Sequence, residues 1–151
     1  MTTVFKGVNY TKAFITDNAK IPQGDAGGKL KCAVEEFTFA VAFGIGDTVL
    51  GPKLPAGARV HNAVISSAST STDGIFELGF LANGVDSADS NAFVDAADAG
   101  GQAVTKQMVD SPNLAGHLKL FTVPTQVVLT GVEATTATSG TVKFAVYYTL
   151  D

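Results

Sequence analysis

From residue 31 onward, apolar and polar side chains alternate along the chain with a period of two, the pattern typical of half-buried β-strands. The clearest strand is predicted over residues 141–150, where one face would carry Val142, Phe144, Val146 and Tyr148. The same pattern predicts strands over residues 31–43, 48–50, 58–67, 75–82, 117–123 and 125–133, and an extended segment over 102–109. Most of the chain after residue 30 is therefore predicted to be β-structure.

The apolar positions of these strands predict the hydrophobic core. In the first strand, Glu35 and Glu36 interrupt the alternation, and we expect a β-bulge there. Cys32 stands alone, so it forms no intrachain disulfide, and we interpret it as a small core residue. The core candidates of three strands are Val34, Phe37, Phe39 and Val41, then Val60, Ala63 and Ile65, then Phe76, Leu78 and Phe80.

Three stretches break the alternation. Residues 51–57 contain two prolines and two glycines, which predict irregular backbone. Residues 90–99 are rich in alanine, begin with Ser90 as a candidate N-cap, and are followed by two glycines that would end a helix, so one short helix is predicted there. Residues 135–140 read as a hairpin-like connector.

About eight short strands with one short helix predict an all-β protein, specifically a jelly-roll-like sandwich of antiparallel strands. An immunoglobulin-like sandwich is less favoured, because its Cys–Trp–Cys signature is missing and the connection over residues 83–116 is long. We expect a single β-sandwich domain over residues 31–151. Residues 1–30 read instead as an extended N-terminal arm, with scattered large side chains and a run of breakers at its end.

Charge is low and unevenly distributed along the chain. Charged residues make up 16% of the sequence, and the formal net charge is −4. Residues 1–31 hold five lysines against two aspartates, a net of +3, whereas residues 73–110 hold seven acids against one lysine, a net of −6. Such asymmetry is typical of an arm that docks on an acidic surface or on a neighbouring copy, although solvated loops with a chance bias are an open alternative.

Composition also limits the partners. Arg59 is the single arginine, so the clustered cations that bind phosphates are missing and we expect no nucleic-acid partner. No apolar run approaches the roughly 18 residues of a membrane helix, so we expect no membrane partner. The N-terminal residues lack a basic segment followed by an apolar one, and we therefore expect synthesis in a cytoplasm.

Candidate chemistry is sparse, and we expect no enzyme and no cofactor. His61 and His117 are the general-base candidates near neutral pH, but the sequence gives them no partner. The glycine-rich residues 24–28 lack the ending of a phosphate-binding loop. The acidic stretch over residues 86–98 could offer oxygen ligands to calcium, but its spacing does not fit an EF-hand, and helix capping and solubility are the favoured roles.

A carbohydrate-binding sandwich is the main alternative function. Such proteins stack sugar rings on exposed aromatic side chains. The chain has no Trp, and Tyr147 and Tyr148 are neighbours in the last strand, so one of them is expected to point inward and one outward. A carbohydrate- or host-receptor-binding module of a phage fibre or adhesin therefore stays open.

Several short motifs occur in a recognisable order. The arm leads to residues 46–51 (GDTVLG), 53–60 (KLPAGARV) and the strand over 61–67. Residues 74–79 (GIFELG), the acidic segment 86–99 and the hairpin 139–144 (SGTVKF) follow. This arrangement resembles the small structural proteins of tailed-bacteriophage heads that decorate and cement the capsid.

The resemblance implies a virion structural protein on the capsid exterior, made in the cytoplasm of a host bacterium. Its expected partners are the major capsid protein and its own copies, with a homotrimer favoured over a dimer. The arm would make these contacts through its lysines and large apolar side chains. The interaction residues it implies are Phe5, Lys6, Tyr10, Lys12, Phe14 and Ile15, together with Lys20 and Lys29.

Overall fold

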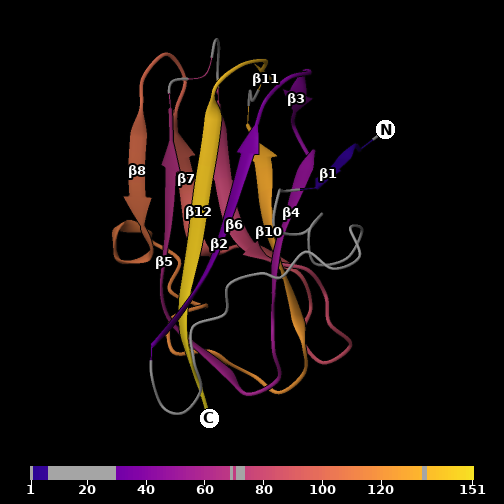
Figure 1. Cartoon of the computed structure of the whole chain (residues 1–151), viewed down its shortest axis with the longest axis vertical. Coiled ribbons are helices and arrows are strands. Elements are labelled where there is room, and N and C mark those ends of the chain that lie inside the picture. The colour runs from indigo at the N-terminus through magenta and orange to yellow at the C-terminus, as the bar shows by residue number, and fades with distance from the viewer. Residues whose placement is uncertain (1, 7–29, 69, 71–73, 134–135) are drawn as a thin grey trace, which may run out of the picture.

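The computed structural model describes residues 2–6, 30–68, 70, 74–133 and 136–151. These residues form a β-sandwich whose strands run along its long axis (Figure 1). Eight of the strands build the two main sheets: β2 (Lys31–Thr38), β4 (Thr48–Leu54), β5 (Ala58–Ser67), β6 (Ile75–Phe80), β7 (Asp89–Asp98), β8 (Val104–Gln107), β10 (Thr125–Val132) and β12 (Thr141–Leu150). Four short strands complete the fold: β1 (Val4–Lys6), β3 (Phe43–Gly44), β9 (Leu120–Phe121) and β11 (Thr136–Ala137).

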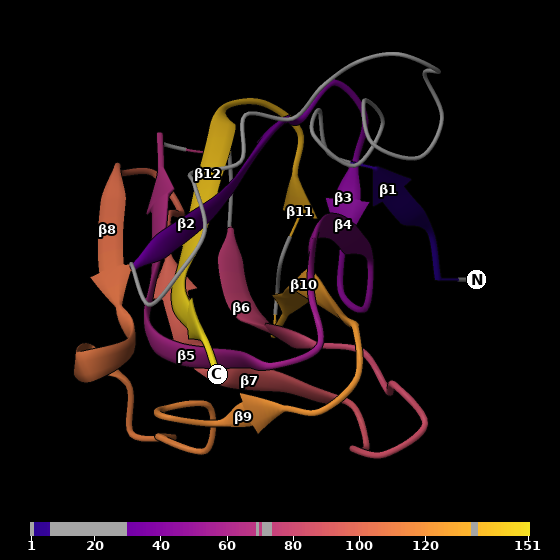
Figure 2. The ribbon, with the colours of Figure 1, turned by 60° about the horizontal axis from the view of Figure 1, so that its bottom comes forward.

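The order of the strands is that of a jelly roll. One sheet has the order β2-β12-β5-β8, and the other has β4-β10-β6-β7 with β1 added beside β4. Numbered along the chain, the eight main strands follow the orders 1-8-3-6 and 2-7-4-5, which is the double Greek key of a jelly roll. All six pairings among these strands are antiparallel. The predicted fold class is confirmed, and Figure 2 shows the two sheets facing each other.

The core lies between the sheets and has an aromatic cluster at each end. The N-terminal-end cluster, defined as Phe5, Phe37, Phe39, Phe43 and Phe76, has neighbouring ring centroids 5.2–6.3 Å apart. The loop-end cluster, defined as Phe80, Phe93 and Phe121, has centroids 5.0–6.3 Å apart. The predicted core positions of β5, β6 and β12 are all buried. Strands β5 and β12 begin and end where the alternation predicted.

The helix predicted over residues 90–99 is wrong, because this stretch is strand β7. Ala92, Phe93 and Val94 are all fully buried, with Phe93 inside the loop-end cluster. The pairing of β7 with β6 shifts register twice, and Ala96 has a positive φ of 47°. These irregularities remove the period of two, so the segment looked helical although its burial in a sheet overrides alanine's helix propensity. The short helical element is instead the 3-10 turn Met108–Asp110.

The irregular backbone predicted over residues 51–57 is also partly wrong, since β4 continues to Leu54. Gly51 and Pro52 both lie opposite Val127, at a register shift between β4 and β10. A bulge is one of the few places where a strand tolerates proline. The side chain of Gln126 donates to the carbonyl oxygen of Gly51 at 2.6 Å and completes the local hydrogen bonding.

The first strand is shorter than predicted, and near its start the side chains that point into the core are not the predicted ones. Strand β2 ends at Thr38, and its pairing with β12 is continuous, so the bulge expected at Glu35 is absent. Glu35 points inward and is fully buried, with one carboxylate oxygen accepting the Glu36 amide at 2.9 Å, whereas Val34 and Val41 are exposed. Cys32 is exposed as well, so its interpretation as a core residue is wrong.

The strand predicted over residues 117–123 is reduced to β9. The residues before β9 form a turn, in which Leu118 has a φ of 59° and is half exposed. Phe121, in β9 itself, is fully buried. The backbone of Val60 exchanges hydrogen bonds with Leu118 and Lys119 at 2.8 and 3.0 Å. These contacts hold the turn against β5 without extending the strand.

Candidate functional site

The N-terminal strand β1 is a three-residue addition to the edge of a sheet. It runs parallel to β4, with Val4 opposite Thr48 and Lys6 opposite Leu50. Just before it, the Thr3 amide donates to Asp47 Oδ1 at 2.7 Å, and the Thr3 carbonyl oxygen accepts from the Thr48 amide at 3.1 Å. The strand therefore covers the open backbone edge of β4 over three residues.

Phe5 is the side chain that fixes β1 to the domain. Its ring lies 5.4 Å from that of Phe37 and 5.3 Å from that of Phe43, and it is half-buried against the core. Lys6 follows it and is exposed. Of the predicted interaction residues, these two are placed on the domain, while Tyr10, Lys12, Phe14, Ile15, Lys20 and Lys29 lie outside the described residues.

The carboxylate of Asp47 links the start of the N-terminal strand to the turn before β4. Its Oδ1 accepts from the Thr3 amide, and its Oδ2 accepts from the Gly44 amide at 2.9 Å. Gly46 has a φ of 79°, which favours glycine in the turn that brings the carboxylate into place. The motif over residues 46–51 thus has a structural reason, since it builds the edge that receives the N-terminal strand.

Exposed apolar side chains gather in segments at both ends of the sandwich. Val4, Val41 and Ile45 are exposed near β1 and β3, with Ile45 at 67%. The opposite loops expose Val85, Val109, Leu114 and Leu118. Large apolar side chains left in water in this way are typical of surfaces that a protein partner covers.

An ion pair between two partly buried side chains joins the loops at the end of the sandwich opposite β1. Lys119 Nζ lies 2.7 Å from Asp86 Oδ1 and also stands over the rings of Phe80 and Phe121, at 5.4 and 5.5 Å from their centroids. Hydrogen bonds from Lys119 and Asn83 lower the pKa of Asp86, so it is a carboxylate at neutral pH. This network fixes the loop-end cluster from outside.

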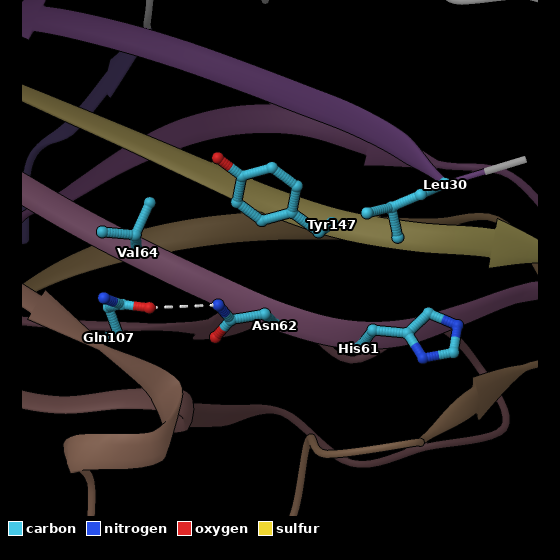
Figure 3. Close-up of a pocket in the computed structure, with 6 residues that line it drawn as sticks. All are labelled: Leu30, His61, Asn62, Val64, Gln107 and Tyr147. Atoms are coloured by element: carbon cyan, nitrogen blue, oxygen red, sulfur yellow. Dashed lines mark hydrogen bonds between the residues drawn. The ribbon is translucent and has the colours of Figure 1, made fainter.

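A shallow hollow of about 390 Å³ lies on the outer face of the β2-β12-β5-β8 sheet (Figure 3). Tyr147 stands in the middle of this face, with Cys32 on one neighbouring strand and Asn62 on the other. Figure 3 shows its ring lying flat, with one face turned outward. The hollow is lined by Leu30, His61, Asn62, Val64, Gln107 and Tyr147.

A bulge explains why two consecutive polar residues line the hollow. Tyr147 pairs with Asn62 and Tyr148 with Val60, so His61 is the extra residue on β5. The bulge turns both His61 and Asn62 away from the core, which alternation alone would not allow. As expected, one of the two tyrosines points inward: Tyr148 is buried and Tyr147 faces outward.

The polar side chains of the hollow are held in place. Asn62 Nδ2 donates to Gln107 Oε1 at 3.2 Å, and Asn62 Oδ1 accepts from the Ala63 amide at 2.9 Å. His61 Nε2 is hydrogen-bonded to Thr149 Oγ1 at 2.9 Å. The side-chain nitrogen Nε2 of Gln107 and Nδ1 of His61 have no partner among the described residues and can meet a ligand.

Cys32 and Tyr147 stay protonated at neutral pH. Partial burial between its neighbours raises the pKa of the Cys32 thiol, and a hydrogen bond with Tyr147 offsets this rise only in part. The pKa of Tyr147 is raised chiefly by the charge that Cys32 would bear as a thiolate. A protonated thiol is a poor nucleophile, so this pair offers packing and a neutral ring rather than catalysis.

The acidic segment gives the second sheet a different outer face. Glu77 on β6 accepts from Ser90 Oγ at 2.6 Å, and its pKa is raised by burial and further by Asp95 and Asp89. The described residues contain no group of three or more His, Cys, Asp or Glu side chains that could hold a metal ion. The calcium-like stretch over residues 86–98 is mostly strand β7 and its preceding loop.

The remaining chemical candidates stand apart from any catalytic arrangement within the described residues. His61 belongs to the hollow, and His117 is exposed in the turn after Gly116. No helix among the described residues is long and apolar enough to span a bilayer. The sequence did not predict the hollow, because its one sequence signal was the outward position of Tyr147 and the bulge at His61 has no sequence signature.

Comparison with known proteins gives a likeness in fold. Neither the protein-family models nor the curated proteins contain a match. A chain from the capsid of Ralstonia phage GP4 superposes with a TM-score of 0.73 at 16% identity, covering 99% of both chains. A chain from the capsid asymmetric unit of cyanophage Pam1 gives 0.61 at 22% identity, covering 92% of this chain and 99% of that one.

A third structure, the acid-stable capsid of Helicobacter pylori bacteriophage KHP30, gives a TM-score of 0.50 at 17% identity and covers 84% of this chain and 93% of that chain. The three matches agree in two respects. Each covers more than four fifths of both chains, and each comes from a phage capsid. The jelly roll described above is thus a fold that occurs among the chains of phage capsids.

Proposed function

We propose that this chain is a virion structural protein that decorates and cements the outer surface of a phage capsid. The observation that supports this most strongly is the end-to-end likeness to a chain of the GP4 capsid, which covers 99% of both chains. Low charge, exposed apolar ends and the lack of any catalytic arrangement among the described residues fit a protein built for contacts with other proteins.

Residues 1–30 act in this proposal as the arm that binds the neighbouring capsid subunit or another copy. Phe5 and Lys6 lie in β1, the part of the arm that pairs with β4, and the basic balance of residues 1–31 suits an acidic partner surface. The copies associate with each other, as a trimer in preference to a dimer. The arm and the sandwich of residues 31–151 then have separate tasks, contact and coverage.

The test mixes the purified protein with capsid shells assembled without it and measures co-sedimentation. We expect the protein to bind at a fixed ratio to the shell subunits and its mass in solution to be that of a trimer. Lys6→Glu should weaken binding by about tenfold or more through charge reversal in the arm. Lys53→Glu, an equal reversal at an exposed position farther along β4, is the matched control and should bind normally.

Two results would refute the proposal. The first is a monomer that fails to bind shells with its arm intact. The second is equal binding by the wild type, Lys6→Glu and Lys53→Glu, which would show that Lys6 in the arm takes no part in the contact.

A further inference from the structure

The hollow around Tyr147 combines three properties that bear on what it can bind. Its centre is an aromatic ring lying flat with one face outward (Figure 3). Its rim holds two side-chain amides joined by a hydrogen bond, Asn62 and Gln107, and an imidazole fixed by Thr149. None of the six lining residues is an acid, a lysine or an arginine.

These properties select a ligand that is neutral, has a flat apolar face and bears hydroxyl or amide groups at its edge. A saccharide ring has this form: its C–H face stacks on an aromatic ring, and its hydroxyls exchange hydrogen bonds with amides. Because Asn62 and Gln107 are already positioned by their mutual hydrogen bond, little side-chain freedom would be lost on binding.

Two other kinds of ligand fit less well. An anion fits less well because the lining contains no lysine or arginine, and His61 is its single basic side chain. A purely apolar molecule would leave much of its surface in water, because the hollow is shallow and open. A small polar ring can be half covered at no such cost.

A protein surface also fits this face less well. A stable protein contact covers about 800 Å² on each partner, so it would extend well beyond the six residues that line the hollow. On this sheet it would also cover Lys143 and Glu36, which form an ion pair at 3.0 Å with both side chains about half exposed. Desolvating that pair opposes such docking, whereas a single sugar ring leaves it in water.

We propose that the hollow binds a neutral saccharide, stacked on Tyr147 and hydrogen-bonded by Gln107 and Asn62, with His61 Nδ1 as a further contact. Leu30 and Val64 flank the ring and offer an apolar surface to an acetamido methyl group, so N-acetylhexosamines are the preferred class. This activity goes beyond capsid decoration: the exposed face of a decorating protein would attach the particle to glycans.

The experiment titrates the full-length ¹⁵N-labelled protein, free of capsid, with N-acetylglucosamine, glucose and glucuronate and follows amide chemical shifts. Shifts are expected to centre on the backbone around His61–Val64, Gln107 and Tyr147, with dissociation constants of about 1–10 mM for single sugars. N-acetylglucosamine should bind most tightly and glucuronate most weakly.

Variants separate stacking from folding. Tyr147→Phe keeps the ring and should bind within about twofold of wild type, whereas Tyr147→Ala should weaken binding by about tenfold. Gln107→Ala should weaken it by about threefold to tenfold. Lys143→Ala, an exposed change on the same sheet face, is the matched control and should leave the affinity unchanged.

The proposal fails if no sugar shifts these resonances at 50 mM, a concentration roughly fivefold above the weakest expected dissociation constant. It fails equally if the shifts centre on another surface, or if Tyr147→Phe loses binding as fully as Tyr147→Ala. A change of oligomeric mass in Tyr147→Ala would show that a second copy occupies the hollow, and would also overturn it. None of these outcomes bears on whether the protein binds capsid shells.

Discussion

At the loop end of the sandwich, the cluster of Phe80, Phe93 and Phe121 is covered by a turn that is bonded to its surroundings at several points. At the N-terminal end, the corresponding cluster is completed by Phe5, which belongs to a strand of only three residues. At the loop end, Lys119 forms an ion pair with Asp86 and lies over the rings of Phe80 and Phe121. At the N-terminal end, β1 is held by the Asp47 carboxylate and by its pairing with three residues of β4.

The difference teaches where contacts can be exchanged. The turn over residues 114–119 lies between two strands of its own domain, and Gly116 is so close to β7 that a Cβ would come within 2.5 Å of the Ala92 carbonyl oxygen. Strand β1 lies at the edge of its sheet and pairs with β4 alone among the described residues. We therefore expect the loop end to determine stability and the N-terminal end to determine association.

The largest expected effect comes from breaking the loop-end cluster. Phe93→Ala removes a fully buried ring and should lower the free energy of unfolding by about 3–5 kcal/mol, because the surrounding strands cannot close the cavity. Urea unfolding followed by circular dichroism measures it. A loss below about 1 kcal/mol would mean that this end is not the stabilising one.

The matching change at the other end is Phe5→Ala. Because Phe5 is only half-buried, the expected loss of unfolding free energy is about 1–2 kcal/mol, clearly less than for Phe93→Ala. The same variant should lose most of its binding to capsid shells. A variant that unfolds as easily as Phe93→Ala yet still binds shells would reverse the comparison.

A smaller change loosens β1 without touching its aromatic side chain. Asp47→Asn removes the charge that accepts from the Thr3 and Gly44 amides, and should cost about 1 kcal/mol. Hydrogen exchange should then accelerate at the amides of residues 3–6 and stay unchanged at Leu118. Equal acceleration at both ends would show that the two ends open together.

The smallest effect depends on pH and concerns the loop end. The pKa of Asp86 is lowered in the folded chain from a value of about 3.9 when unfolded, so its contribution is present above that value and is lost as the pH falls through the folded pKa. Asp86→Asn should therefore lower stability by about 0.5–1 kcal/mol at pH 7.

The gap between this variant and the wild type should be smaller at pH 2 than at pH 7, because protonation of Asp86 removes the charge that the variant lacks. Thermal unfolding at the two pH values measures the difference. A gap that persists unchanged at pH 2 would mean that shape rather than charge links Asp86 to Lys119.

Alternation predicted the fold well where a strand has one face in the core, as in β5 and β12, whose bounds it gave. It failed at β7, because register shifts hid the period of two and the alanines suggested a helix. It also failed at Glu35, since burial of a carboxylate in the core opposes every general preference for where charges lie. Long-range packing decides both positions, and it leaves no local signal.

The candidate sites show the same limit. The arm's basic and aromatic residues were visible in the sequence, and Phe5 and Lys6 do lie at a sheet edge. The hollow was not visible, because it depends on a bulge that places His61 beside Asn62 and on strands that bring Gln107 within reach from 45 residues away.

The central claim, that this chain covers the outside of a phage capsid, is tested most directly by an electron cryomicroscopy reconstruction of shells assembled with and without the protein. The account predicts additional jelly-roll density on the outer surface, arranged in trimers, with the first 30 residues reaching a neighbouring subunit. Identical maps with and without the protein, or density on the inner surface only, would contradict it.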